Sequence, residues 1–328
     1  MKRRTLAQAA LALSFAAAGL VHAPGFAQAK EVNFGIISTE SSANLKSAWA
    51  PLLDDLQKVT GLKVNAFFAP DYAGVIEGMR FNKVQVAWMG NKSGMEAVDR
   101  ANAEVFAKVT QADGAAGYWS LMVVQKDSPL KTLEDVLKNR AGLTLGYGDP
   151  NSTSGTLVPS YYAFAQNKVD PVKDFKRTVR ANHETNILAV VSKQVDVATV
   201  ASDAVDRMKM KQPEKHAELR VVWKSPLIPS DPMLWRKDLD ADTKKKLRDF
   251  FMVYGKDERE KGILKTLTFA GFVASDNTQL VPIRQLELVR GRAKIETDTT
   301  ISAEEQQKKL KEIDGRLAEL QKLVASVN

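Results

Sequence analysis

The feature of this sequence that most constrains its fold is a repeated alternation of short apolar runs with segments of helical periodicity. A strand-like run at residues 32–37 precedes residues 45–59, in which leucine and tryptophan recur every three or four positions. Strand-like runs return at residues 62–68 and 84–88, and residues 73–81 have a helical pattern between them. This order of elements is typical of a parallel sheet flanked by helices.

The alternation begins again after residue 121, which predicts a second α/β lobe of the same kind. A weak internal repeat supports this, because NKVQVA at residues 82–87 resembles KQVDVA at residues 193–198, and AVDR follows each. Two later strands, at residues 221–223 and 233–235, are predicted to return the chain to the first lobe. The second set of predicted elements comprises strands at 121–124, 143–146, 175–179 and 195–198, and helices from about Leu133, at 156–166 and at 184–192.

The N-terminus has the pattern of a cleaved secretory signal peptide. Lys-Arg-Arg at residues 2–4 precedes an apolar run at 9–21, and Ala-Gln-Ala at 27–29 forms a small-x-small cleavage site. The apolar run is shorter than the roughly 20 residues of a membrane span. The alternative is a buried N-terminal helix, and the paired arginines leave a twin-arginine export route open beside the general one. We therefore predict that residues 1–29 direct export to a Gram-negative periplasm.

Composition excludes several classes of function. The chain contains no cysteine, which excludes disulfides, thiolate metal sites, catalytic cysteine and a lipidated N-terminal cysteine. No cluster of histidine and carboxylate side chains has the spacing of a metal site, so we predict neither metal nor cofactor. The formal charge is +8, with cations and anions interspersed except at residues 244–246. We interpret that lysine triplet as a solvated helix face and predict no nucleic-acid partner.

The sequence GDPNSTSGT at residues 148–156 follows a predicted strand that ends at Tyr147 and opens a predicted helix. The first N–H groups of a helix have no partner within the helix, and the helix dipole adds positive potential there. Together they form an anion site without a basic side chain, and the serine and threonine hydroxyls add neutral donors. The alternative is ordinary helix capping by serine or asparagine.

Known catalytic motifs do not match this loop. It lacks the Gly-Lys-Ser/Thr ending of a nucleotide-binding loop and the Gly-x-Ser-x-Gly spacing of a nucleophile elbow. His183 lies about 30 residues downstream, which leaves open an exported hydrolase that uses Ser152 or Ser154 with this histidine. No base, nucleophile and orienting group are recognisable together, so we predict that the protein is not an enzyme.

The C-terminal residues carry an apolar stripe on a predicted long helix. Leu310, Ile313, Leu317, Leu320 and Val324 are spaced alternately three and four residues apart. The stripe predicts either packing against the helix's own domain or a homodimer, and the pattern does not separate the two.

Several segments together resemble the periplasmic phosphonate-binding proteins of ABC importers, over residues 32 to about 290. The segments that carry the resemblance are NFGIISTES (33–41), AFFAPDYAG (66–74), GMRFNKV (78–84), ADG (112–114), GYWS (117–120), GDPNSTSG (148–155), HETN (183–186), QVDVAT (194–199) and KSPLIP (224–229).

The resemblance implies the type II periplasmic-binding fold, in which two α/β lobes are joined by two crossing strands and close on a ligand. The expected division is a signal peptide at 1–29, one lobe at 30–121 plus 226–298, the other at 122–225, and an amphipathic helix at 299–328. It also implies an ABC permease in the membrane as partner.

The resemblance implies how a phosphonate would be held. Ser152, Thr153 and Ser154 would bind the phosphonate oxygens, and His183 and Tyr72 would complete that end of the site.

Tyr118 would line the cleft, and two carboxylates would receive the ammonium of an aminoalkylphosphonate such as 2-aminoethylphosphonate. Asp231 matches one of these carboxylates. Asp203 matches the other, where the family pattern has a glutamate. We therefore predict a solute-binding component for alkyl- or aminoalkylphosphonates. The alternatives are a binder of another small oxyanion or phosphate ester, and the hydrolase above.

Overall fold

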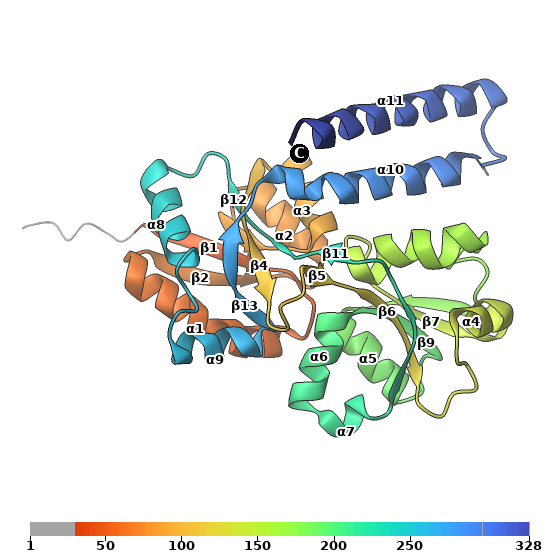
Figure 1. Cartoon of the computed structure of the whole chain (residues 1–328), viewed down its shortest axis with the longest axis horizontal. Coiled ribbons are helices and arrows are strands. Elements are labelled where there is room, and N and C mark those ends of the chain that lie inside the picture. The colour runs from red at the N-terminus through yellow and green to blue at the C-terminus, as the bar shows by residue number, and fades with distance from the viewer. Residues whose placement is uncertain (1–29, 297, 328) are drawn as a thin grey trace, which may run out of the picture.

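The computed structural model describes residues 30–296 and 298–327, so the predicted signal peptide lies outside the described residues. The chain forms two α/β lobes, with a pair of long helices above them (Figure 1). Within the described range, no helix is both long and apolar enough to span a bilayer. The two-lobed α/β architecture that the resemblance implies is confirmed.

The first lobe is built on a six-stranded sheet in the order β13-β4-β12-β3-β1-β2. Strands β1, β2 and β3 are parallel, as predicted, whereas β4, β12 and β13 join the sheet by antiparallel pairing. The sequence analysis did not identify β4 or β13. The elements of this lobe are β1 (Glu31–Ile36), α1 (Ser42–Thr60), β2 (Lys63–Phe68), α2 (Tyr72–Arg80), β3 (Val86–Trp88), α3 (Asn91–Arg100), β4 (Ala103–Gln111), β12 (Pro232–Arg236), α8 (Ala241–Phe251), α9 (Glu258–Thr266) and β13 (Phe269–Ala274).

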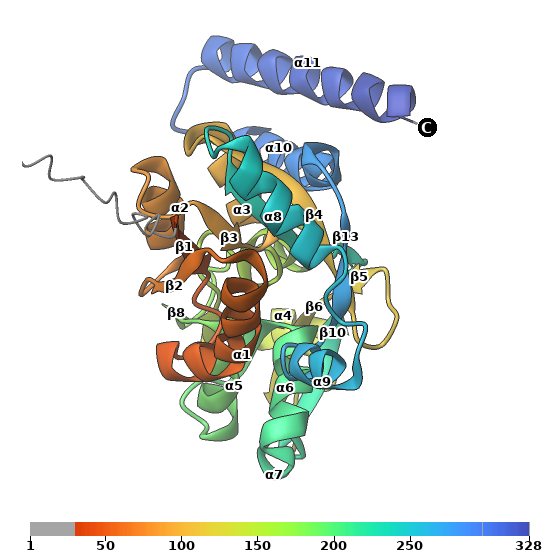
Figure 2. The same ribbon diagram turned by 90° about the vertical axis from the view of Figure 1, so that its left-hand side faces the viewer.

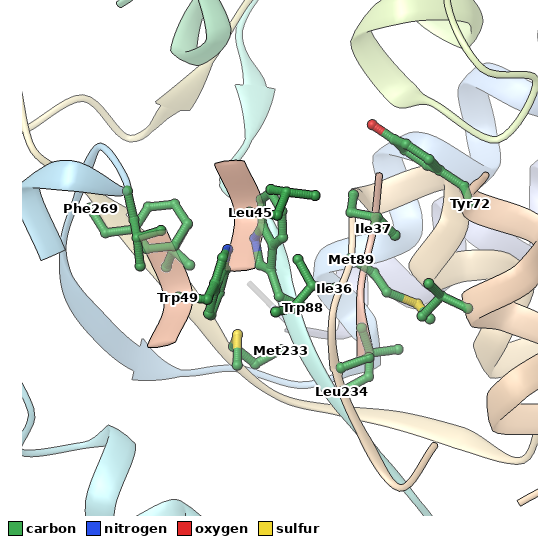
Figure 3. Close-up of a cluster of buried hydrophobic side chains, with 14 of the residues drawn as sticks. Ile36, Ile37, Leu45, Trp49, Tyr72, Trp88, Met89, Met233, Leu234 and Phe269 are labelled. Atoms are coloured by element: carbon green, nitrogen blue, oxygen red, sulfur yellow. The ribbon is translucent and has the colours of Figure 1, made fainter. Parts of the chain in front are cut away.

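Aromatic side chains fill the core between this sheet and its helices. The ring of Trp49 on α1 lies 5.3 Å from that of Trp88 and 6.0 Å from that of Phe269. All three are buried (Figure 3). Such tilted aromatic pairs add about 0.5–1.5 kcal/mol each beyond the area that they bury. The packing fixes the ends of β1 and β3, from which the loops of the cleft begin.

The second lobe has a five-stranded sheet in the order β10-β6-β9-β7-β8. Residues 221–223 form part of β10, which pairs with β6 of this lobe, so the prediction that they return the chain to the first lobe is wrong. The chain crosses only after Lys224, and β12 makes the return. The elements are β6 (Ser120–Gln125), α4 (Leu133–Asn139), β7 (Thr144–Tyr147), β8 (Arg177–Arg180), α5 (His183–Val191), β9 (Val197–Ala201), α6 (Ser202–Lys211), α7 (Pro213–His216) and β10 (Leu219–Lys224).

The helix predicted at residues 156–166 begins three residues earlier and is wound partly as π-helix, over Thr153–Leu157 and Ser160–Phe164. The Leu157 N–H donates to the Ser152 carbonyl, five residues back, at 3.1 Å. Such wide turns are rare and are frequently found at functional sites. The π-helical segment starts directly after the loop that follows β7.

Two short strands, β5 (Gly117–Tyr118) and β11 (Ile228–Pro229), pair antiparallel where the chain crosses between the lobes. A Cβ atom on Gly117 would lie only 1.9 Å from the Ile228 carbonyl oxygen, so the crossing requires glycine there. The Ser225 N–H also donates to the Ser120 carbonyl at 2.9 Å. The two crossing strands are therefore held tightly together.

Helices α10 (Val281–Glu296) and α11 (Ala303–Val327) form an antiparallel hairpin. In the turned view, α11 lies on the outer side of α10, away from the lobes (Figure 2). Arg292 pairs with Asp314 at 2.9 Å, and the stripe residues Leu310, Ile313, Leu317 and Leu320 are half-buried. The intramolecular packing alternative is therefore present, and dimerisation through the same helix stays a prediction.

Candidate functional site

A cavity lies between the two lobes, next to the crossing strands. All eight residues that the resemblance implies line this one cavity, although they come from segments more than 150 positions apart in the sequence. They are Tyr72, Tyr118, Ser152, Thr153, Ser154, His183, Asp203 and Asp231.

The N-terminal ends of five helical segments meet at this cavity. Tyr72 is the first residue of α2, Thr153 opens the π-helical segment, and His183 is the first residue of α5. Gly90 and Ala201, the N-cap residues of α3 and α6, also line the cavity. Because each helix contributes partial positive charge at its N-terminus, this region of the cavity attracts anions.

The hydroxyl loop both caps its helix and leaves donors available. The Ser152 hydroxyl accepts from the Gly155 N–H at 2.9 Å, so the capping alternative is correct for Ser152. Among the described residues, the N–H groups of Thr153 and Ser154 and the Ser154 hydroxyl make no hydrogen bond. Gly148 and Gly155 approach so closely that a Cβ on Gly155 would meet the Gly148 Cα at 2.9 Å.

The same loop contacts the helices of the first lobe across the cleft. The Thr153 Oγ1 accepts from the Lys92 N–H in the first turn of α3 at 2.8 Å. The Asp149 Oδ2 accepts from the Tyr72 N–H at 3.2 Å. Since Thr153 uses its oxygen in this contact, its hydroxyl hydrogen remains available to donate. These contacts join the two lobes, so the structure represents a closed arrangement.

His183 is a neutral donor in this site. Its Nδ1 accepts from the Ala201 N–H at 3.3 Å, which places the ring proton on Nε2, 3.4 Å from the Ser152 Oγ. Burial, reinforced by the nearby Arg207, lowers the pKa of His183 to about 3. An imidazole that carries its proton toward Ser152 does not accept the serine proton, which argues against the hydrolase alternative.

Two tyrosines line the cavity as neutral hydroxyl groups. Burial and the charge of Asp149 raise the pKa of Tyr72 far above its ordinary value, and burial with Asp231 does the same to the pKa of Tyr118. The Tyr72 hydroxyl points away from the apolar cluster beneath it (Figure 3). Both phenols therefore keep their protons, and the Tyr118 hydroxyl faces the Asp231 carboxylate.

Two carboxylates, Asp203 in the first turn of α6 and Asp231, also line the cavity. Burial raises the pKa of Asp203 to about 6. Burial and then Asp203 raise the pKa of Asp231 well above its ordinary value. In the part of the chain that the structure describes, the buried Asp231 Oδ1 has no hydrogen-bond partner. An unpaired, buried carboxylate oxygen is costly, and a cation that binds there would offset that cost.

Sequence reasoning missed Arg207, which also lines the cavity. The expectation of a site without basic side chains therefore holds for residues 148–156 but not for the cavity as a whole. Arg207 on α6 forms a buried ion pair with Glu40 of the first lobe, which also accepts from Lys211 at 3.3 Å. Burial acts to raise the pKa of Glu40, but Arg207 and Lys211 outweigh it and lower that pKa.

Two further polar atoms at the cavity were also missed. The Thr39 hydroxyl and the Trp88 Nε1 are buried, line the cavity and have no hydrogen-bond partner within the described range. Thr39 lies in the polar loop after β1, but nothing in that loop's sequence distinguishes it from its neighbours. Trp88 belongs to an apolar strand run that reads as core. The structure thus adds two donors to the predicted set.

Comparison with known proteins agrees with this geometry. Residues 34–280 match the family model of the periplasmic substrate-binding protein of phosphonate ABC transporters. The chain is 56% identical to the phosphonates-binding periplasmic protein of Escherichia coli, over 90% of this chain and 87% of that one. A crystal structure of the binding-protein component of an ABC phosphonate transporter from Pseudomonas aeruginosa has a TM-score of 0.89 at 56% identity, over 91% of this chain and 99% of that one.

A more distant relative is the phosphate-import protein of Mycolicibacterium smegmatis, 29% identical over 67% of this chain and 70% of that one. These relatives are substrate-binding transport proteins rather than enzymes. The matched residues include both sheets and every predicted site residue. The chain therefore belongs to the family of periplasmic substrate-binding proteins of phosphonate ABC transporters.

Proposed function

We propose that this protein binds alkyl- and aminoalkylphosphonates such as 2-aminoethylphosphonate in the interlobe cavity and delivers them to an ABC permease. The observation that carries this proposal is the polarity of the cavity. Helix N-termini and hydroxyl groups line it together with two carboxylates, one of which has an unpaired oxygen. A zwitterion with an anionic head and an ammonium tail fits this arrangement.

At the anionic end, the N–H groups of Thr153 and Ser154 and the hydroxyl groups around them donate to the phosphonate oxygens. Hydrogen bonds to a charged group contribute about 1.5–3 kcal/mol each. A few of them reach the −8 kcal/mol of a micromolar complex. Neutral His183 and Tyr72 add donors without adding charge, so the head is held mainly by dipoles.

At the cationic end, Asp231 and Asp203 receive the ammonium group. The ammonium supplies the partner that the Asp231 Oδ1 lacks, and its charge favours the ionised form of both carboxylates. The same carboxylates repel a ligand that carries negative charge at both ends, which gives selectivity against such compounds.

Closure of the lobes around the ligand completes the proposed mechanism. We propose that residues 30–121 plus 226–298 and residues 122–225 move as two bodies, with the hinge at the paired crossing strands. Each body alone supplies only part of the ligand contacts, so the ligand favours the closed form. We also propose that residues 1–29 are removed on export. The N-terminal mass of the protein recovered from a periplasmic extract tests this proposal.

A second candidate function is binding of inorganic phosphate or a related oxyanion. The relative named as a phosphate-import protein favours it, together with an anionic end that needs no amine on the ligand. Calorimetric titration of the protein without residues 1–29 separates the candidates, using methylphosphonate, 2-aminoethylphosphonate and phosphate at one pH. The proposed function requires a phosphonate to bind at micromolar concentration or tighter. If phosphate binds well above both phosphonates, the second candidate is correct.

A further inference from the structure

A second cavity adjoins the ligand cavity beside the crossing strands. Asp203 lines both cavities, so its side chain lies at the boundary between them. An aspartate carboxylate reaches one methylene less far than a glutamate carboxylate would. Asp203 therefore obstructs the boundary between the two cavities less than a glutamate at this position would.

The same structural elements present opposite faces to the two cavities. Tyr118 lines the ligand cavity, whereas its neighbours Gly117 and Trp119 line the second one. On α6, Arg207 lines the ligand cavity, whereas Ser202, Asp206 and Met210, spaced four residues apart, line the second cavity. Residues at this spacing share one helix face. The second cavity is thus built on the elements that form the hinge and the amine end of the site.

The lining of the second cavity favours a cation that carries hydrogen-bonding groups. Asp113 and Asp206 join Asp203 there, and the only lysine among its lining residues is Lys265. Burial and then Asp113 raise the pKa of Asp206, which indicates that these carboxylates lie near one another.

A second observation, independent of the carboxylates, also indicates a ligand. Gln111 lines the second cavity and is only 6% exposed, and its Nε2 has no hydrogen-bond partner among the described residues. Buried polar atoms without partners are rare and need an explanation. The ligand cavity contains three such atoms, on Thr39, Trp88 and Asp231, so the two cavities share this property.

We propose that the second cavity receives the extended or N-substituted cationic tail of an aminoalkylphosphonate, and that the short side chain of Asp203 admits it. This inference rests on the proposed function. The phosphonate head stays at residues 152–155, the first amine lies at Asp203 and Asp231, and a second amine reaches Asp206. Asp206 lies about 4.5 Å further along the helix axis than Asp203, a distance that a two-carbon spacer spans.

The test uses three ligands that share one head: methylphosphonate, 2-aminoethylphosphonate and the diamine 2-[(2-aminoethyl)amino]ethylphosphonate. Each is titrated calorimetrically into the wild type, Asp203→Glu, Asp206→Asn and Asp127→Asn, the last being a control on an exposed loop of the same lobe. The quantity compared is the ratio of diamine affinity to 2-aminoethylphosphonate affinity in each protein.

We expect the wild type to bind the diamine at least as tightly as 2-aminoethylphosphonate. The affinity ratio should fall about 3–5-fold in Asp206→Asn, as for a partly exposed ion pair. It should fall at least tenfold in Asp203→Glu and stay unchanged in Asp127→Asn. A wild type that binds the diamine more than tenfold more weakly, or an Asp203→Glu variant with an unchanged ratio, overturns the inference. If methylphosphonate and 2-aminoethylphosphonate both fail to bind the wild type, the proposed function itself is wrong.

Discussion

Replacing Asp231 by asparagine should separate the two ends of the binding cavity. The substitution keeps the size of the side chain and removes its charge. In the wild type, Asp231 is 8% exposed, its Oδ1 is unpaired, and the phosphonate end of the site lies on other elements. A hydrogen bond from an ammonium group to a buried carboxylate contributes about 1.5–3 kcal/mol, and asparagine removes the charge on which it depends. The affinity for 2-aminoethylphosphonate should therefore fall about 10- to 150-fold.

Methylphosphonate has the same head and no amine, so its affinity should change less than about threefold, which is about half of the 1.4 kcal/mol that a tenfold change requires. Calorimetry with both ligands at pH 7.5 measures the difference, and Asp127→Asn serves as a charge-matched control on the surface. The melting temperature of the ligand-free variant should not fall, because burial raises the pKa of Asp231, so its charge adds little stability that asparagine would remove. Equal losses of affinity for the two ligands would refute the two-ended site.

Three further outcomes are expected. Ser154→Ala should lower the affinity for both phosphonates about equally, by roughly tenfold or more, because a donor to the charged head is lost. A calorimetric loss of affinity for only one of them would contradict this role. The affinity ratio of 2-aminoethylphosphonate to methylphosphonate should fall as the pH drops from 8 to 5, because Asp203, whose pKa burial raises to about 6, becomes neutral below that value. His183, with a pKa of about 3, stays neutral over this range. An affinity ratio that does not change with pH would exclude this role for Asp203. Glu40→Gln should lower the affinity for every ligand alike, by about 100-fold, because the closed form then buries Arg207 without its partner at a cost of about 3 kcal/mol or more. Small-angle scattering should show a more open protein. A loss of affinity for only one ligand would contradict a role of Glu40 in closure.

The alternation of strands and helices was predictable because each element carries its own periodic pattern. The loop at residues 148–156 was predictable for a similar reason, since its turn residues and hydroxyl groups are adjacent in the sequence. The antiparallel strands β4 and β13 were not, because their pairing joins residues more than 150 positions apart.

The cavity itself depends on such distant contacts. Nothing near Arg207 in the sequence indicates Glu40 as its partner, and Trp88 reads as an ordinary core residue until the packing exposes its Nε1 to the cavity. The helices at residues 73–81 and 184–192 were predicted, but α3 and α6 were not, and the convergence of their N-termini follows only from the fold. The loop pattern selected Ser152, Thr153 and Ser154 as an anion site, whereas the binding roles of the other five site residues came from the resemblance to phosphonate-binding proteins.

We propose that helix N-termini hold the phosphonate head while Asp231 and Asp203 hold the amine. A crystal structure of the complex with 2-aminoethylphosphonate would show both contacts at once. We expect phosphonate oxygens about 3 Å from the N–H groups of Thr153 and Ser154, and the ligand nitrogen at hydrogen-bond distance from the Asp231 Oδ1. A ligand bound in the reverse orientation, or bound outside this cavity, would contradict it.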